Sequence, residues 1–225
     1  MTFQTRASPH VLTANSVTRV MGLVLLALIP GLGVMTWLFG WGVLINASLA
    51  TLTAVAAEAL FLRLRQRPVL PAVSDLSAVV TAVLLAICLP PLLPWWLTVG
   101  GTLFAILIVK QLYGGLGYNP FNPAMAGYVL LLVSFPVEMT RWSLPLPLTG
   151  VELGLLDTLQ IQFAGGLPEA LSWDALSGAT PLDQMRQGLD QARLIGEIQQ
   201  DGAWGLFGGQ GWEWISAAFL LGGLV

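Results

Sequence analysis

Three long runs without a charged residue limit what this chain can fold into: Val20–Ala57, Leu76–Val109 and Gln111–Val137. A helix needs about 20 apolar residues to cross a bilayer, so the first two runs are long enough to cross twice. Only 9% of all residues are charged, against roughly 25% in an ordinary soluble domain. Unbroken apolar runs favour helices over alternating strands. The predicted fold is all-α, a polytopic helical membrane protein.

Prolines and charges set the ends of the expected spans. Leu89–Pro94 contains three prolines, which cannot continue a helix, so it is the predicted turn between the third and fourth spans. Only twelve residues follow Glu213, too few for a crossing. We therefore expect the chain to be an incomplete copy of a longer protein. The expected spans are Val20–Phe39, Gly42–Leu62, Leu76–Leu89, Trp95–Val109, Pro123–Val137 and a sixth that begins near Trp214.

Basic residues near span ends mark the cytoplasmic side of a membrane protein. With a cytoplasmic N-terminus, six of the nine basic residues fall on that side: Arg6, Arg19, Arg63, Arg65, Arg67 and Lys110. The segment Glu138–Asp201, which carries nine acids, then lies outside. The predicted organisation is a membrane domain with five spans (1–137), an extracytoplasmic loop (138–213) and the start of a sixth span (214–225).

Two features inside the membrane domain leave alternatives open. Glu58 lies within the second expected span, where an acid is a functional candidate. Arg63 and Arg65 are close enough in sequence to pair with it instead, which is the favoured interpretation. The stretch Lys110–Met125, KQLYGGLGYNPFNPAM, has the glycines and Asn-Pro pairs of a structured loop. An interhelical connector is favoured there over a ligand-wrapping loop.

The outer segment contains DALSGATPLD, from Asp174 to Asp183. Thr180 and Pro181, followed by Asp183, predict a helix start with threonine as the N-cap. An apolar stripe of Leu182, Met185, Leu189, Ala192 and Ile195 would continue that helix. The small residues Ser177, Gly178 and Ala179 also leave the Thr180 hydroxyl open to another protein. A phosphate on Thr180 would lie at a helix N-terminus, which favours anions.

These stretches together resemble the D-subunit family of the Rnf (Rsx) ion-translocating electron transport complex, related to the B subunit of sodium-translocating NADH:quinone reductase. The matching stretches occur in the family's order and cover about the first two thirds of a family member. They are SPH at Ser8–His10, RVMGLVLLALIPGL at Arg19–Leu32, KQLYGGLGYNPFNPAMAGY at Lys110–Tyr128, SFPVEMTRW at Ser134–Trp142 and DALSGATPL at Asp174–Leu182.

The resemblance implies FMN attached to Thr180 through a phosphoester. A flavin transferase that uses FAD would install it by recognising the box of Asp174, Ser177, Gly178, Ala179 and Thr180. It further implies a bacterial inner membrane location, electron transfer between ferredoxin and NAD coupled to Na⁺ or H⁺ movement, and other members of the complex as partners beside the lipid bilayer. It leaves open a second, non-covalent flavin such as riboflavin. Neither a catalytic residue, a metal ligand nor nucleic acid binding is predicted.

Two other function classes remain open at this point. A transporter or channel component without redox chemistry would use the Lys110–Met125 loop as a gate, and a scaffold would use the outer segment for docking. Both predict an unmodified Thr180. Trp142, Trp173 and Trp204 are candidates to pack near a flavin ring, and the residues do not distinguish among them.

Overall fold

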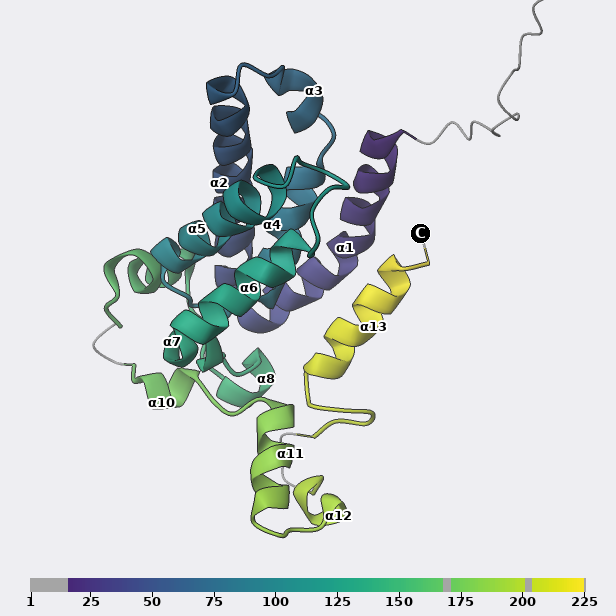
Figure 1. The fold of residues 1–225 in the computed structure, drawn as a ribbon. Coiled ribbons are helices and arrows are strands. Elements are labelled where there is room, and N and C mark those ends of the chain that lie inside the picture. The colour runs from purple at the N-terminus through teal and green to yellow at the C-terminus, as the bar shows by residue number, and fades with distance from the viewer. Residues whose placement is uncertain (1–15, 168–170, 201–203, 225) are drawn as a thin grey trace, which may run out of the picture.

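The computed structural model describes residues 16–167, 171–200 and 204–224. All regular elements in these ranges are helices (Figure 1), which agrees with the predicted all-α class. They are α1 (Val17–Phe39), α2 (Gly42–Leu64), α3 (Val69–Val73), α4 (Ser77–Cys88), α5 (Trp95–Leu103), the π-helix η1 (Phe104–Gln111), α6 (Pro123–Ser134), α7 (Pro136–Thr140), α8 (Leu146–Thr149), α9 (Leu155–Leu159), the π-helix η2 (Gln160–Ala164), α10 (Trp173–Leu176), α11 (Pro181–Asp190), α12 (Ile195–Ile198) and α13 (Trp212–Gly222).

Two of these helices, α1 and α2, are long and apolar enough to cross a membrane. Each has 23 residues, so each extends about 35 Å at 1.5 Å per residue. Large apolar side chains point outward from both, including Trp37 at 65% and Leu52 at 70% exposure. Such outward apolar faces suit a lipid environment, since water would disfavour them.

The third and fifth expected spans are shorter than predicted. The helices α4 and α6 have 12 residues each, or about 18 Å, less than the ~30 Å hydrocarbon core. α6 ends at Ser134 because Pro136 follows, and the residue before a proline avoids the helical region; Phe135 has φ −135° and ψ 59°. The predicted proline turn is confirmed, because α4 ends at Cys88 and α5 begins at Trp95.

Small residues form the core between α2, α4 and η1. Ala50, Ala54 and Ala57 of α2 face an alanine series on α4, with Ile106 of η1 against them. Alanines allow helix backbones to approach closely, and van der Waals packing is a main source of helix association inside a membrane. We call this cluster the alanine core; its members are Ala50, Ala54, Ala57, Ala78, Ala82, Ala86 and Ile106.

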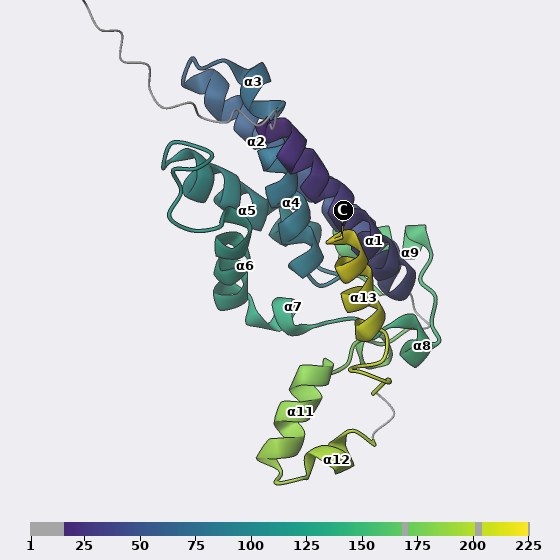
Figure 2. The ribbon, with the colours of Figure 1, turned by 90° about the vertical axis from the view of Figure 1, so that its right-hand side faces the viewer.

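The helix α13 packs along α1, although the two are far apart in sequence (Figure 2). A side chain built on Gly222 would lie 1.8 Å from the backbone oxygen of Ala27. On the α1 side, Gly31 faces the ring of Phe219 in the same way. The crossing therefore depends on glycine at both contacts.

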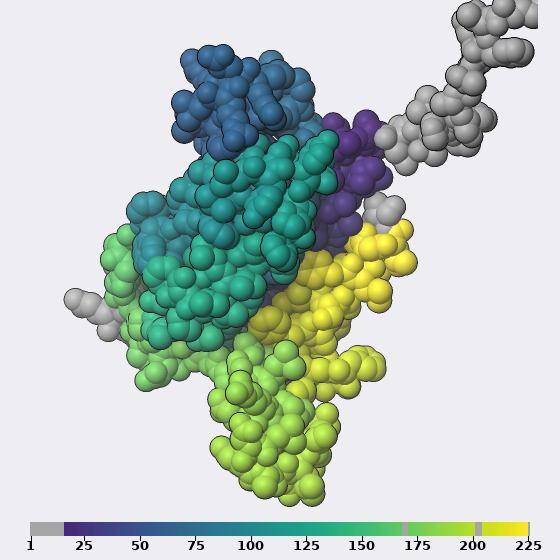
Figure 3. All heavy atoms as spheres, in the orientation of Figure 1, coloured from purple at the N-terminus to yellow at the C-terminus, as the bar shows by residue number. Residues whose placement is uncertain are grey.

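The pair α11 and α12 projects from one end of the helical bundle (Figure 3). The predicted apolar stripe is wrong here, because α11 ends at Asp190 and Ala192 adopts a left-handed conformation with φ 57°. Leu182 is 82% exposed, and Ile195 belongs to α12. Ile198 packs over Gly188 to join the two helices, and a side chain at position 188 would require Ile198 to move.

Candidate functional site

Backbone contacts fix the small-residue part of the outer box. Gly178 donates its N–H to the Trp142 carbonyl at 3.2 Å, and Leu144 donates to the Leu176 carbonyl at 3.0 Å. A side chain on Gly178 would lie 2.6 Å from a methyl carbon of Leu144. The glycine is therefore needed for the segment to lie against residues 142–144. This contact positions the start of α11.

Thr180 is the N-cap of α11, as the sequence predicted. Its hydroxyl oxygen accepts the N–H of Asp183 at 3.3 Å, and Pro181 occupies the first turn. The hydroxyl also donates to the Asp183 carboxylate at 2.7 Å. Asp183 was expected only as a first-turn acid, and its direct contact with the hydroxyl was not foreseen.

An apolar groove of about 370 Å³ opens beside the Thr180 side chain. Gly209 lets the chain close over Pro181, since a side chain there would lie 2.1 Å from the proline ring. The indole nitrogen of Trp204 is buried, and it has no hydrogen-bond partner among the described residues. We call this cavity the Thr180 groove; it is lined by Thr180, Pro181, Leu182, Trp204, Gly208, Gly209 and Trp212.

The structure shows which tryptophans line the Thr180 groove, a point that the sequence left open. Trp204 and Trp212 line the Thr180 groove. Trp142 packs instead against Trp212 and Phe39, with ring centroids 5.3 and 6.0 Å away, and these two rings also contact each other. Trp173 lies under the guanidinium of Arg141 at 4.7 Å. Trp212 was not among the predicted candidates. The glycines at 208, 209 and 211 were the sequence feature that could have pointed to it, because they lie next to it in the chain.

The other residues of the box serve local structure. The Ser177 hydroxyl donates to the Trp173 carbonyl at 2.8 Å, which closes α10. The Ala179 carbonyl accepts from the Gln184 side chain at 3.0 Å. Asp174 lies exposed on α10, and among the described residues no hydrogen bond joins it to Thr180. Asp174 is thus accessible to a partner protein rather than part of the groove.

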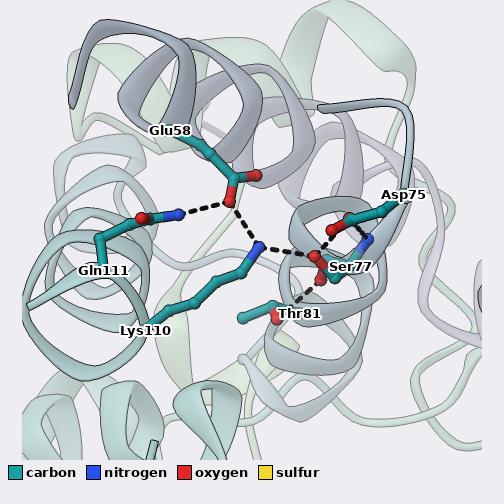
Figure 4. Close-up of polar contacts among 6 residues, drawn as sticks. All are labelled: Glu58, Asp75, Ser77, Thr81, Lys110 and Gln111. Carbon is teal, nitrogen blue, oxygen red and sulfur yellow. Dashed lines mark hydrogen bonds and ion pairs between the residues drawn. The ribbon is translucent and has the colours of Figure 1, made fainter. Parts of the chain in front are cut away.

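A second polar site lies in the helical bundle around Glu58 (Figure 4). The expected pairing with Arg63 or Arg65 is wrong: Lys110 of η1 donates to Glu58 Oε1 at 2.6 Å, and both side chains are at most 3% exposed. Arg65 instead stacks on Phe61, 4.8 Å from its ring centroid. The misleading signal was nearness in sequence, because Lys110 is 52 residues from Glu58.

The glycine-rich loop connects η1 to α6 and is structured, as predicted. Gly114, Gly115 and Gly117 have positive φ values of 115°, 98° and 85°, which glycine adopts without strain. Asn122 caps α6 by accepting the Ala124 N–H at 3.0 Å. The loop is thus an interhelical connector, the alternative that the sequence favoured over a ligand-wrapping loop.

Comparison with known proteins shows which family the chain belongs to. Residues 4–225 match the family described as NQR2, RnfD, RnfE. The chain is similar to proteins named as the D subunit of an ion-translocating oxidoreductase complex: that of Escherichia fergusonii (45% identical, 100% of this chain and 66% of the relative), that of Yersinia pestis (48%; 99% and 65%) and that of Alcanivorax borkumensis (52%; 100% and 64%). It thus spans just under two thirds of these relatives' length. With the match covering nearly every residue, the chain belongs to the NQR2, RnfD, RnfE family.

Proposed function

We propose that this chain is an electron-transfer subunit of a membrane-bound, ion-translocating ferredoxin:NAD oxidoreductase-type complex, with FMN joined to Thr180 by a phosphoester. The observation that carries the proposal is the Thr180 hydroxyl at the edge of an apolar, tryptophan-lined groove. The names of the relatives support the complex, since each is a subunit of an ion-translocating oxidoreductase complex.

The residues around Thr180 fit the two ends of FMN. A phosphate on the hydroxyl lies at the N-terminus of the ten-residue helix α11, where free N–H groups and the helix dipole favour anions. The groove offers apolar surface for a flavin ring, and the buried Trp204 N–H, which no described residue accepts, is a donor for one of its polar atoms or for the phosphate. Residues next to the Thr180 hydroxyl thus offer both a site that favours the phosphate and an apolar surface for the ring.

Attachment of FMN to Thr180 would break the hydrogen bond between the Thr180 hydroxyl and Asp183. When the Thr180 oxygen forms its bond to phosphorus, it loses the hydrogen that it donates to Asp183. Two negative groups, the phosphate and the Asp183 carboxylate, then lie close together, and like charges repel. We expect the Asp183 side chain to turn toward solvent, where the exposed position allows it.

When bound, the flavin holds one or two electrons, and the protein fixes its position and tunes its potential. The groove residues would hold the ring, and Thr180 would keep it from dissociating. A bacterial inner membrane location, a cytoplasmic N-terminus, an extracytoplasmic Thr180, a flavin transferase as maturation partner and a second, non-covalent flavin belong to the same proposal. The apolar helices α1 and α2 support the membrane location.

Intact-mass analysis with peptide mapping tests the attachment. The chain is co-expressed with a flavin transferase, and we expect one FMN-sized adduct on the peptide that contains Thr180. Thr180→Ala should abolish the adduct, because the acceptor oxygen is gone. Thr180→Ser is the matched control, since it retains a hydroxyl and an N-cap. An adduct that persists in Thr180→Ala, or its absence from the unmodified chain, contradicts the proposal.

A further inference from the structure

We propose that Asp183 is the general base for attachment of FMN to Thr180, so that the chain supplies a catalytic residue for its own modification. This role rests on the proposed function, because it concerns the reaction that forms the phosphoester. Asp183 lies outside the box that a flavin transferase is expected to recognise, which ends at Thr180. Its carboxylate is nevertheless in direct contact with the oxygen that must react.

The Thr180 hydroxyl directs its hydrogen at a carboxylate oxygen. Oγ1 donates to Asp183 Oδ2 at 2.7 Å, and a general base must lie within about 2.6–3.2 Å of the atom whose proton it removes. Oδ2 meets this requirement without any movement. The same Oγ1 accepts the Asp183 N–H at 3.3 Å. Because a hydroxyl oxygen has two acceptor lone pairs, one of them stays available to attack a phosphorus atom.

Other helices of the protein show that a capping acid need not touch a hydroxyl. In α9, Asp157 accepts the backbone N–H of the N-cap residue at 3.2 Å, and in α12 Glu197 does the same at 3.0 Å. Both acids stand at the third helical position, as Asp183 does in α11. The Asp183 carboxylate instead bonds the side-chain hydroxyl of its N-cap residue. Helix capping therefore does not by itself explain this contact.

The Asp183 carboxylate is free to accept a proton and to pass it on. Among the described residues, its hydrogen-bond partner is the Thr180 hydroxyl, and no ion pair joins it to Arg186 one turn further along α11. Glu197 of the neighbouring α12 bonds its own helix start. Asp183 is exposed, and the α11–α12 pair projects from the bundle (Figure 3). Both water and a partner protein can therefore reach this carboxylate.

The reaction transfers one phosphoryl-linked group and oxidises nothing. Thr180 Oγ1 forms a bond to the phosphorus on the FMN side of FAD, while the bond from that phosphorus to the bridging oxygen breaks. AMP leaves with that oxygen and the bonding electron pair. The Thr180 proton moves to Asp183 Oδ2, and Asp183 then releases it to water. The products are the FMN phosphoester, AMP and one proton, so atoms and charge balance.

An aspartate with this task is found in other phosphoryl transfers to hydroxyl groups. In protein kinases, the aspartate of the catalytic loop accepts the proton of the attacking hydroxyl. In this protein the acceptor chain would carry the aspartate itself. The Asp183 carboxylate repels the anionic phosphates of FAD before the reaction, and the repulsion decreases as the proton neutralises it. Relief of repulsion in the transition state accelerates a reaction.

Asp174, the acid within the recognition box, does not fit the role of base. It lies exposed on α10, six residues before Thr180, and no hydrogen bond joins the two among the described residues. A transferase can contact Asp174 from outside without disturbing Thr180. The two acids therefore have separate tasks, recognition for Asp174 and proton transfer for Asp183.

The rate of FMN attachment tests this role. The purified chain, in detergent, is incubated with purified flavin transferase and FAD, and in-gel flavin fluorescence follows attachment at several concentrations of the chain. The variant is Asp183→Asn, which retains the shape of the side chain and a hydrogen-bond acceptor but is not a base. We expect kcat to fall by about 100-fold, the scale for losing a general base. KM for the chain should stay the same, because the box is unchanged.

The pH dependence separates proton transfer from a structural role. Without the Asp183 carboxylate, hydroxide must remove the Thr180 proton, and its concentration rises with pH. The ratio of kcat between the unmodified chain and Asp183→Asn should therefore decrease as the pH rises. Titration of the transferase cancels in this ratio, because both chains react with the same enzyme. A structural role would lower kcat by the same factor at every pH.

Two further variants control for charge and for the carboxylate itself. Asp190→Asn removes a negative charge from the other end of α11 and should leave the attachment rate unchanged. Asp183→Glu retains a carboxylate and should restore part of the rate that Asp183→Asn loses; no gain over Asp183→Asn counts against the proposal. An unchanged kcat in Asp183→Asn, a loss confined to KM, or a kcat ratio that stays constant with pH would each refute it.

Failure of this role and failure of the proposed function give different results. If the transferase modifies an established acceptor protein but leaves the unmodified chain without flavin, both proposals are wrong. If the unmodified chain gains FMN on Thr180 and Asp183→Asn gains it equally fast at every pH, only the role of Asp183 is wrong.

Discussion

Single glycines and amides determine how the polar sites are built. Gly178 lets the outer box lie against Leu144, and Asn46 joins three segments by one side chain. Asn46 donates to the Pro90 carbonyl at 3.0 Å and accepts from Thr98 at 3.2 Å and Gln162 at 3.3 Å. A substitution at either residue tests how much its contacts stabilise the protein.

Gly178→Val should destabilise the outer segment. The new side chain overlaps Leu144, which must move, and overpacking of this kind costs about 1–3 kcal/mol. Limited proteolysis of the segment containing α10 and α11 measures the effect. Gly166→Ala is the control, because that position has open space around it. Equal protease resistance in the two variants would show that the Leu144 contact is unimportant.

Asn46→Ala should lower the thermal stability of the detergent-solubilised protein. The change leaves buried groups of Thr98, Gln162 and Pro90 without this partner, at about 1–3 kcal/mol per unsatisfied group. Ser48→Ala, on the exposed face of the same helix, should leave the unfolding temperature unchanged. A neutral Asn46→Ala would mean that the neighbouring groups find other partners.

At this scale the sequence predicts local contacts and misses distant ones. The Thr180 cap follows from a threonine, a proline and an acid within four residues, because capping depends on groups one turn apart. The Glu58–Lys110 pair joins residues 52 positions apart. Only tertiary packing brings them together, whereas Arg63 is nearer along the chain but exposed.

Helices in this protein are limited by proline and joined by small residues. Proline positions predicted the end of α4 and the start of α5, because proline removes a backbone donor and restricts its neighbour. The π-helix η1 was not predicted; α5 continues into it without a break, and Gly100 and Gly101 in the last turn of α5 were not read as a sign of the change. Lys110 and Gln111 lie at its end, and π-helical segments often occur at functional sites.

Gly222→Leu should separate α13 from α1. A side chain there meets the Ala27 carbonyl, a backbone atom that cannot turn aside, so we expect a loss of at least about 1–3 kcal/mol. Cysteine cross-linking between the two helices should decrease. Gly223→Leu provides an adjacent control, where the nearest atoms are at an ordinary 3.5 Å. Efficient cross-linking in Gly222→Leu would argue against the close crossing.

In the whole molecule, the outer segment and the basic end of α2 lie at opposite ends of the helical bundle. The α11–α12 pair projects from one end of the bundle, and the Arg65 end of α2 lies at the other (Figure 1). Charge counting predicted opposite sides of the membrane for these regions. It could not predict the short helices α7–α10, whose four- and five-residue lengths leave little periodicity to read.

Reporter fusions test the membrane orientation. A reporter active only in the cytoplasm should work when fused near Arg65 and fail near Gln187 on α11. A periplasm-active reporter should give the opposite pattern. Reversed activities would place the Thr180 groove in the cytoplasm and overturn the orientation of the proposal.

The contact between α1 and α13 also has a consequence for biosynthesis. Ala27 and Gly222 touch but are separated by 195 residues, so at ~5–20 residues per second a ribosome needs on the order of 10–40 s between them. During that interval the face of α1 that later receives α13 has no partner within the chain. Lipid, an insertion factor or a neighbouring protein of the complex must cover it, and the arriving α13 must displace that temporary occupant.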